Sequence, residues 1–401
     1  MDLNQKYFEL LLRKKDNKTE DLILKNDDND SKLIPFSLVS DEDEAQFNLY
    51  NYRDLSIDEA LLRSVDLKIL KMQAGLGTSV KRDDLIDGKL SAKGVDLTLD
   101  YKGSDSPIAK IHYYIKEEIK NKKNYKNVTL QNLVNDETKS DIENLFEDDD
   151  VLTSIEQLKM PTIDESGELS DKRLAPCGHG FIGIHEIVDA INGSSDELVC
   201  IGNGEDLNST IDEKIASLVV KENISILMVT TDKTQDDKKG GQLALVKEKI
   251  PYLTIVEKAQ AQSSGQLEYF EKLGLRENDK KGLFNTNIVV INKKALRKNI
   301  KECVKDFNLD SFLESISPNV IKNKKSQNGE SFIQLESALG SVVLNTDRYF
   351  RENHNQKILS VLNLSQKYRD RFFLPIKKRE DYDFIKANYS FDYKELKLLL
   401  S

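Results

Sequence analysis

A glycine turn follows the first strongly apolar run of the sequence. Residues 70–82 read LKMQAGLGTSVKR, so Gly75 and Gly77 come directly after that run. Glycine at the end of a strand lets the backbone approach a phosphate or a base without a Cβ in the way. The turn lacks the third glycine of a dinucleotide fingerprint, because Val80 stands there, and it lacks the Gly-Lys-Ser/Thr of a P-loop. Taken alone, Gly-Leu-Gly is typical of a tight turn, so its context must decide whether it holds a nucleotide.

Six later blocks carry glycines or side chains that could hold anions or a metal ion, or both. They read APCGHGF (175–181), GNGEDLNSTID (202–212), TTDKTQDDKKGG (230–241), FNTN (284–287), IQLESALG (333–340) and FLPIKK (373–378). His179 stands between two glycines, which is a poor position for core packing, so the residues alone leave a functional role and a plain loop role equally open. Glu205 and Asp206 offer the hard oxygen ligands that Mg²⁺ takes, although adjacent carboxylates after a strand ordinarily form a solvated turn.

The elements that must position these blocks alternate between strands and helices. β-rich runs cover 65–72, 197–203, 225–232, 252–259 and 285–292, and helical patterns lie between them at 108–120, 211–222 and 293–307. This alternation predicts an α/β fold with a largely parallel sheet covered on both faces. Ligands of such sheets sit at the carboxyl ends of the strands, so we expect one site at one edge. We interpret residues 1–60 as a helical and acidic N-terminal segment and residues 61–401 as the domain that carries the site.

The composition is that of a soluble globular protein with excess negative charge. Of 401 residues 38% are hydrophobic and 32% charged, and 59 Lys plus Arg against 69 Asp plus Glu give a net charge of −10. Such a field repels polyanions, which argues against a nucleic-acid surface or a polybasic membrane contact. No apolar run approaches the length of a membrane span, and the opening MDLNQKYFELLLRKKD has no signal-type core. The three cysteines are too few for a disulfide framework and lack metal-ligand spacing, so we expect a cytoplasmic protein.

Taken in order, the glycine turn and the six blocks resemble the eukaryotic-type UDP-glucose pyrophosphorylases, a family of UTP:hexose-1-phosphate uridylyltransferases. The resemblance runs from about Val65 to about Tyr389. It implies an α/β/α nucleotidyltransferase domain with a mixed, mostly parallel sheet and a helical C-terminal segment. Family members usually continue into a left-handed β-helix used in assembly. This sequence stops soon after FLPIKK, so we expect the β-helix to be absent and the protein to be a monomer or a weak dimer.

The implied reaction is attack of a sugar 1-phosphate oxygen on the α-phosphorus of UTP, which yields a UDP-sugar and pyrophosphate. Transfer of this kind asks the protein to hold two anions in line and to neutralise them with lysines and Mg²⁺. A convincing Ser/His/Asp or Cys/His constellation is absent from the sequence, which is consistent with such chemistry.

The resemblance assigns the nucleotide to backbone and amide groups. Residues 72–75 match the family's Leu-Asn-Gly-Gly, with Ala74 adding a methyl group where backbone usually approaches the ligand. Gln157 matches a glutamine that reads the base, because a primary amide can serve both a donor and an acceptor of uracil. The assigned nucleotide-binding residues are Met72, Gln73, Ala74, Gly75, Gly77, Gln157 and Gly178.

The same comparison assigns the sugar phosphate and the metal ion. The sugar-phosphate residues are His179, Asn203, Gly204, Glu257 and Asn287, with residues 240–241 closing the pocket through their backbone. Glu205 falls on the family's metal-binding Asp, and Asp206 is the alternative ligand. The QLESALG block is expected to start a helix beneath the site.

Two lysines are assigned to catalysis by the resemblance. Lys377 in FLPIKK matches the late lysine that neutralises the phosphates during transfer. One register keeps the family's early phosphate lysine as Lys93, whereas another puts Asp96 there. We take the first register because a carboxylate against a triphosphate would be repulsive.

Three functions stay open on the sequence alone. The first is a uridylyltransferase that uses glucose 1-phosphate. The second is a relative that uses N-acetylhexosamine or galactose 1-phosphate. The third is a nucleotide-sugar-binding regulator that has lost turnover, which the substitutions at Ala74 and Glu205 favour and the presence of Lys377, His179 and Asn287 opposes.

Overall fold

The structure is a computed structural model, and it describes most of the chain in eleven stretches. They are residues 2–15, 33–76, 80, 92–146, 152–235, 237, 240–263, 265–272, 282–303, 307–327 and 330–391. Within these stretches no helix is both long and apolar enough to cross a bilayer.

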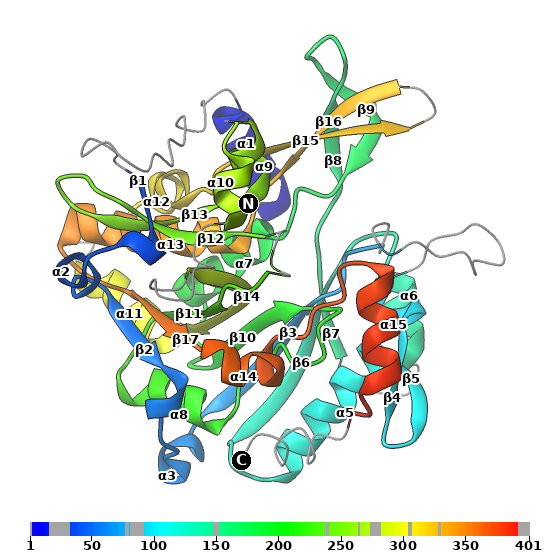
Figure 1. Ribbon diagram of the computed structural model, residues 1–401, viewed down its shortest axis with the longest axis vertical. Coiled ribbons are helices and arrows are strands. Elements are labelled where there is room, and N and C mark those ends of the chain that lie inside the picture. The colour runs from blue at the N-terminus through cyan, green and yellow to red at the C-terminus, as the bar shows by residue number, and fades with distance from the viewer. Residues whose placement is uncertain are drawn as a thin grey trace.

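A mixed β-sheet crosses the middle of the molecule (Figure 1). In the described part of the chain it has eleven strands, and its main path runs in the order β2 (Asn48–Asn51), β17 (Leu359–Asn363), β11 (Ile226–Asp232), β14 (Leu283–Asn292), β10 (Leu198–Asn203), β3 (Asp66–Met72), β6 (Asn127–Val134) and β7 (Leu152–Glu156). Neighbours along this path are parallel except at β14, which runs antiparallel to β10 and to β11. The predicted mixed, mostly parallel sheet is confirmed.

An antiparallel extension joins the sheet at β14. It consists of β1 (Leu33–Pro35), β12 (Gln242–Val246) and β13 (Tyr252–Val256), with β12 paired to both of the others and to β14. Since β1 and β2 precede residue 60, the N-terminal segment contributes two strands to the same sheet as the rest of the chain.

Side chains of the central strands alternate between two hydrophobic cores, one on each face of the sheet. In β10, Val199 and Ile201 enter the first core, whereas Leu198 and Cys200 enter the second. Both faces are therefore buried, which is why these strands read as continuous apolar runs in the sequence. Each buried aliphatic side chain contributes ~1.5–3 kcal/mol relative to exposure.

Helices cover both faces. The first core is closed by α1 (Leu3–Lys14), α7 (Gly180–Asn192), α11 (Lys293–Cys303), α12 (Leu309–Ile316) and α13 (Leu339–His354). The second is closed by α5 (Ile108–Asn121), α8 (Glu213–Lys221), α14 (Ser365–Phe372) and α15 (Arg379–Asn388). The short helices are α2 (Asp41–Glu44), α3 (Glu59–Leu62), α4 (Lys93–Asp96), α6 (Lys139–Glu143), α9 (Lys258–Ser263) and α10 (Leu267–Lys272).

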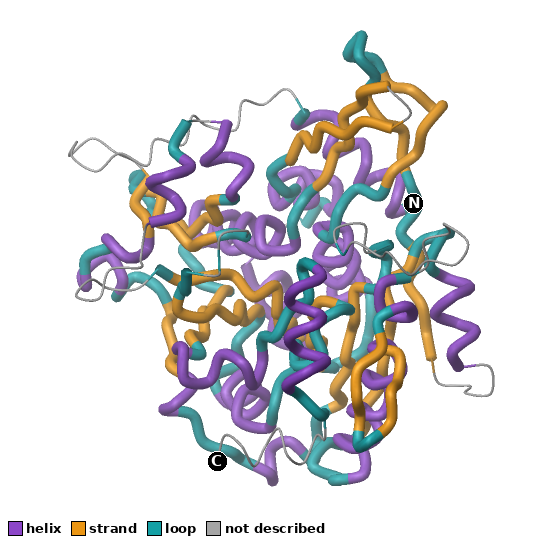
Figure 2. The backbone as a smooth tube through the Cα atoms, turned by 45° about the vertical axis from the view of Figure 1, so that its right-hand side comes forward, coloured by secondary structure: helices purple, strands orange, loops and turns teal. Residues whose placement is uncertain are grey.

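A small four-stranded sheet stands clear of the main body in both views (Figures 1 and 2). Its order is β15 (Ile321–Gln327), β16 (Glu330–Glu336), β8 (Met160–Ile163) and β9 (Leu169–Ala175), and a separate hairpin pairs β4 (Thr98–Tyr101) with β5 (Ser104–Pro107). The expectation that QLESALG starts a helix was wrong for its first half. Residues 334–336 complete β16, because pairing with β15 outweighs their local helical preference, and α13 begins only at Leu339.

Candidate active site

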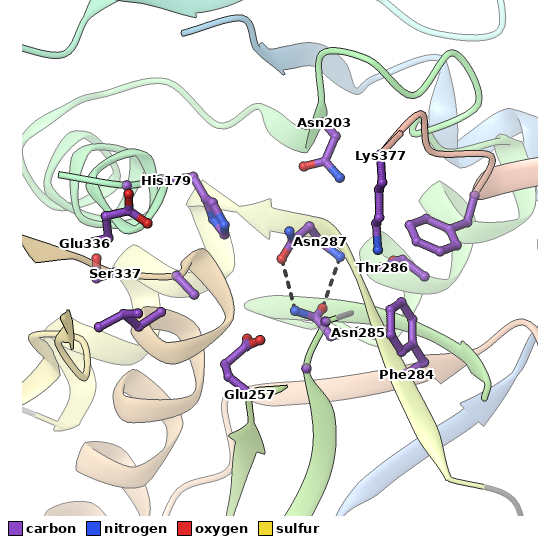
Figure 3. A pocket seen from close by; sticks show the side chains of 16 residues that line it. His179, Asn203, Glu257, Phe284, Asn285, Thr286, Asn287, Glu336, Ser337 and Lys377 are labelled. Atoms are coloured by element: carbon purple, nitrogen blue, oxygen red, sulfur yellow. Dashed lines mark hydrogen bonds between the residues drawn. The ribbon is translucent and has the colours of Figure 1, made fainter. Parts of the chain in front are cut away.

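The glycine-rich blocks meet at one edge of the main sheet. The strands β3, β10 and β11 all run in the same direction, so their carboxyl ends lie together. A cavity of ≈ 300 Å³ opens at this edge (Figure 3). Its lining includes six residues singled out in the sequence, which are Gly178, His179, Asn203, Glu257, Asn287 and Lys377. It also includes residues 240 and 241.

The Gly178–His179 turn is shaped by contacts with the chain before α13. Gly178 has a φ of 78°, a left-handed conformation, and a Cβ added there would lie 2.5 Å from the carbonyl oxygen of Ser337. His179 accepts a hydrogen bond at Nδ1 from the N–H of Leu339 at 3.0 Å. The loss of hydration in this setting lowers the pKa of His179 to about 4. The ring is therefore neutral near pH 7, with its proton on Nε2, and can donate one hydrogen bond.

Lys377 reaches into the cavity beside an aromatic pair (Figure 3). Its Nζ lies 5.0 Å from the ring centroid of Phe284 and 5.6 Å from that of Phe373. Withdrawal from water lowers the pKa of Lys377, while the nearby carboxylates of Asp237 and Glu205 oppose this. An ammonium held among rings is poorly hydrated, so an anion placed beside it is attracted more strongly than one in bulk water.

Glu257 and Asn287 face the same space from two other strands. Glu257 follows β13, and burial raises its pKa to about 7 against the attraction of Lys377. Asn287 has a φ of 62°, and Asn285 holds it there, because the Asn287 N–H donates to Oδ1 of Asn285 at 3.1 Å and Nδ2 of Asn285 donates to Oδ1 of Asn287 at 3.0 Å. The paired amides and the carboxyl group are suited to sugar hydroxyls. A Cβ at Gly241 would lie 2.7 Å from Oε1 of Glu257, so glycine is needed beside this carboxyl.

Gln157 does not line the cavity itself but contacts its glycine turn. Its N–H donates to the carbonyl of Val134 at 2.8 Å, and its side-chain Nε2 donates to the carbonyl of Gly178 at 2.7 Å. The amide oxygen and the second hydrogen of Nε2 remain for a base. Asn203 ends β10, and the next residue, Gly204, donates its N–H to the carbonyl of Met72 at 3.1 Å. These bonds tie the amide of Gln157 and the end of β10 to their neighbouring loops.

The first glycine turn packs against the loop after β10. Gln73 is buried, and its Nε2 donates to the carbonyl of Gly204 at 3.3 Å. A Cβ at Gly204 would lie 2.6 Å from the amide carbon of Gln73, so the side chain fills this space. The carbonyl of Ala74 accepts from Asn135 at 3.0 Å. Gln73 is thus an internal brace between two loops in this structure.

The carbonyl of Gly75 accepts from the N–H of Lys93 at 2.9 Å. This bond joins the first glycine turn to Lys93, another candidate site residue. Gly77, which was assigned to the nucleotide, lies outside the described residues.

Two charged loops meet near Lys93. Its Nζ lies 3.4 Å from Oε1 of Glu205 and also donates to the carbonyl of Ile376, the residue before Lys377. Asp206 is buried, its Oδ1 accepts from the N–H groups of Asn208 and Leu374 at 3.1 Å each, and burial raises its pKa to about 7. Of the two candidate metal ligands, Glu205 is the more exposed; Asp206 is buried, with Oδ1 bonded to backbone and Oδ2 without a hydrogen-bond partner among the described residues.

Several lining residues were not singled out from the sequence. They are Phe284, Asn285, Thr286, Ile321, Glu336, Ser337, Ala338 and Phe373. Most lie inside the quoted blocks, so a signal was present, but an aromatic residue or a serine next to apolar residues is typical of a core.

A mixed sheet with glycine turns and a lysine-containing cavity at its carboxyl edge defines a nucleotidyltransferase-like α/β protein. The family model described as UTP–glucose-1-phosphate uridylyltransferase matches residues 120–400, which is more than half of the chain. The chain therefore belongs to this family.

Relatives and solved structures agree with this assignment. The UTP–glucose-1-phosphate uridylyltransferase of Encephalitozoon cuniculi is 28% identical over 334 residues, covering 80% of this chain and 58% of the relative. That of Saccharomyces cerevisiae is 27% identical over 228 residues, covering 56% of this chain and 40% of the relative. A variant of UDP-glucose pyrophosphorylase from Leishmania major in complex with UDP-glucose superposes with a TM-score of 0.64 at 22% identity, covering 95% of this chain and 75% of that one. The chain thus spans little more than half the length of the first relative, and the structural likeness establishes the fold.

Proposed function

We propose that the protein forms UDP-glucose and pyrophosphate from UTP and glucose 1-phosphate. The observation that carries the proposal is the cavity in which Lys377, His179, Glu257 and Asn287 converge. Its volume of ≈ 300 Å³ lies at the lower end of the range for small-molecule pockets. It combines two groups suited to phosphate with two suited to sugar hydroxyls. The names of the relatives support the choice of glucose among the hexoses.

The nucleotide would lie between the first glycine turn and Gln157. With one hydrogen of Nε2 bonded to Gly178, the amide oxygen of Gln157 would accept the N3–H of uracil. Cytosine carries a lone pair at that position, so the same oxygen would repel it. This supports UTP over CTP as the substrate.

The phosphates would meet the lysines at the edge of the sheet. Lys93 pairs with Glu205 in this structure, and its bond to Ile376 places it one residue from Lys377. This geometry supports the register that keeps Lys93 as the early phosphate lysine. An incoming triphosphate would exchange the carboxylate of Glu205 for its own oxygens at Lys93.

We propose Mg²⁺ as the cofactor, with Glu205 as its protein ligand. Among the residues that the structure describes, no group of three or more His, Cys, Asp or Glu side chains is arranged to hold a metal ion. Mg²⁺ at nucleotide sites is often held by one or two carboxylates and by substrate phosphates, which suits a single carboxylate here. When bound, the ion would supply positive charge to the phosphate oxygens.

The residues then account for a transfer without a protein nucleophile. An oxygen of the hexose 1-phosphate, already anionic, attacks the α-phosphorus, and the bond to the bridging oxygen of the β-phosphate breaks as pyrophosphate leaves. No proton has to be removed from the attacking oxygen, so a general base is not required. His179 donates through Nε2 to the sugar phosphate, and Lys377 stabilises the charge that develops between the two substrates.

A pyrophosphate-release assay tests the proposal. Purified protein is mixed with Mg²⁺, UTP and the 1-phosphates of glucose, galactose or N-acetylglucosamine in turn. We expect the highest kcat/KM with glucose 1-phosphate. Release with another sugar only would change the substrate, and UTP binding without release from any sugar would favour the regulator.

We also propose that the protein is cytoplasmic and a monomer or a weak dimer. The three cysteines are unpaired thiols, which supports a reducing compartment. Light scattering at micromolar concentration tests the assembly state, and a stable octamer would contradict it.

A further inference from the structure

Helix α1 contacts the site although its sequence carries no recognised motif. It packs on α7, the helix that begins directly after His179 (Figure 1). Two side chains from its first two turns, Asn4 and Tyr7, make hydrogen bonds to segments more than a hundred residues away in the chain. Both segments adjoin Gly178.

Asn4 forms hydrogen bonds with the backbone on both sides of Gln157. Its Nδ2 donates to the carbonyl of Glu156 at 3.2 Å, and its Oδ1 accepts from the N–H of Leu158 at 2.9 Å. One side-chain amide thus pairs with two peptide groups, as a neighbouring strand would. The segment has just left β7, which ends at Glu156, so Asn4 supplies the pairing that the sheet no longer gives.

These hydrogen bonds from Asn4 add to two others that already fix Gln157. Its N–H is bonded to Val134 and its side chain to Gly178. A base-reading amide works only when it is held within a few tenths of an ångström of its productive place. The contacts of Asn4 complete the set that determines where the amide oxygen of Gln157 points.

Tyr7 makes the second contact, on the sugar-phosphate side. Its hydroxyl is hydrogen-bonded to Oγ of Ser337, and its ring meets Phe181 edge-on with centroids 5.6 Å apart. Ser337 lines the cavity, donates its N–H to the carbonyl of Cys177 at 3.0 Å and accepts from the N–H of Gly180 at 3.0 Å. Tyr7 therefore fixes Ser337, the residue after β16, whose backbone is hydrogen-bonded to the residues on either side of the Gly178–His179 turn.

Basic side chains along α1 anchor the helix at a second place. Lys6 pairs with Asp310 at 2.6 Å, Arg13 pairs with Glu314 at 3.2 Å, and Lys14 donates to the carbonyl of Ser317 at 2.8 Å. These partners lie on or directly after α12, away from the cavity lining. Arg13 and Glu314 are both well exposed, so their pair contributes little to stability. Arg13 offers a matched control on the same helix.

We propose that α1 is a positioning element of the site, with Asn4 setting the place of Gln157 and Tyr7 setting the place of Ser337. The inference rests on the proposed function, because it assigns Asn4 to uracil selection and Tyr7 to sugar-phosphate binding. The two contacts are independent, so each has its own readout. A merely structural role would reduce the amount of folded protein and leave ligand preference unchanged.

Asn4→Ala tests the first contact by isothermal titration with UTP and with CTP. We expect the preference for UTP over CTP to fall about tenfold, the effect of losing one well-formed hydrogen-bonding arrangement. Arg13→Ala should keep the preference of the wild type within about twofold. An Asn4→Ala protein with the wild-type preference would overturn the assignment of Asn4. Wild-type protein that binds UTP no better than CTP would overturn the proposed function and this inference together. If Asn4→Ala does not fold, Asn4→Asp keeps the acceptor for Leu158 and should show a smaller fall in the same ratio.

Tyr7→Phe tests the second contact, since it removes one oxygen and keeps the ring against Phe181. We expect the KM for glucose 1-phosphate to rise about fivefold to tenfold while kcat and UTP affinity stay within about twofold. An unchanged KM would remove Tyr7 from the proposal. A loss of UTP affinity equal to the rise in KM would show a general loosening of the fold and would equally overturn it.

Discussion

Replacing Lys377 with Met separates charge from packing in the cavity. Met keeps the length of an apolar stem between Phe284 and Phe373, whose ring centroids lie 5.0 Å and 5.6 Å from Nζ, and it removes the charge. A unit charge 4 Å from a phosphate oxygen is worth ~4 kcal/mol at an effective dielectric constant of about 20. Losing one such donor typically lowers kcat by about 10²–10³, because much of the interaction forms only in the transition state. We expect kcat to fall about 10³-fold and the UTP dissociation constant to change less than tenfold.

The same variant should lose activity but be at least as stable as the wild type. The lowered pKa of Lys377 means that the fold disfavours its charged form, chiefly through lost hydration. Met avoids that cost, so Lys377→Met should melt at or above the wild-type temperature. The assay is steady-state pyrophosphate release, with titration of UTP for binding and thermal unfolding for stability. A variant with wild-type kcat would refute the assignment, and so would an activity loss that only follows a loss of folded protein.

Three further changes test other parts of the site. Gly178→Ala should destabilise the protein by at least ~1 kcal/mol in urea unfolding, because of the positive φ and the 2.5 Å approach of the new Cβ to Ser337; equal stability would show that the turn rearranges freely. Burial raises the pKa of Glu257 from 4.5 to about 7, so the folded state holds this proton more tightly than the unfolded state does. The free energy of unfolding therefore falls as the pH rises from about 4.5 to about 7. Glu257→Gln should therefore lose ~1–2 kcal/mol less between pH 5 and pH 8 than the wild type, and parallel pH curves would exclude this carboxyl as the cause. Glu205→Gln should raise the Mg²⁺ concentration needed for half-maximal activity more than it weakens metal-free UTP binding, with Asp206→Asn as control; the reverse pattern would make Asp206 the ligand.

The fold could be predicted where local pattern and tertiary environment agree. The runs at 65–72, 197–203 and 225–232 became β3, β10 and β11 because both faces of these strands are buried, and burial on both faces is visible as continuous apolar sequence. The direction of β14 was not predictable in the same way. An apolar run carries no direction, and the pairing of Val199 with Ile291 depends on the path of the whole chain between them.

The candidate site, too, was predictable only where the local sequence carries the signal. The sequence pointed to glycines and polar residues in these blocks, and the end of β10, the antiparallel strand β14 and the segment between α14 and α15 bring Asn203, Asn287 and Lys377 to one cavity. The assignment of Gln73 to the nucleotide concerns its backbone and stays a prediction, while the structure shows its side-chain amide buried against Gly204. That contact joins residues 131 positions apart. No local pattern distinguishes an amide that meets a ligand from one that braces two loops.

The protonation state of His179 could not be predicted from the sequence, because it depends on tertiary contacts. The sequence supplies a histidine between two glycines, which could be a cation for phosphate or a neutral donor. The N–H that settles the question comes from Leu339, 160 positions later, and it occupies Nδ1. Together with the lost hydration that lowers the pKa to about 4, this bond leaves a neutral ring with its proton on Nε2. In the proposed reaction His179 would therefore orient a phosphate by one directed hydrogen bond at neutral pH, and the positive charge for transfer would have to come from the lysines and the proposed metal ion.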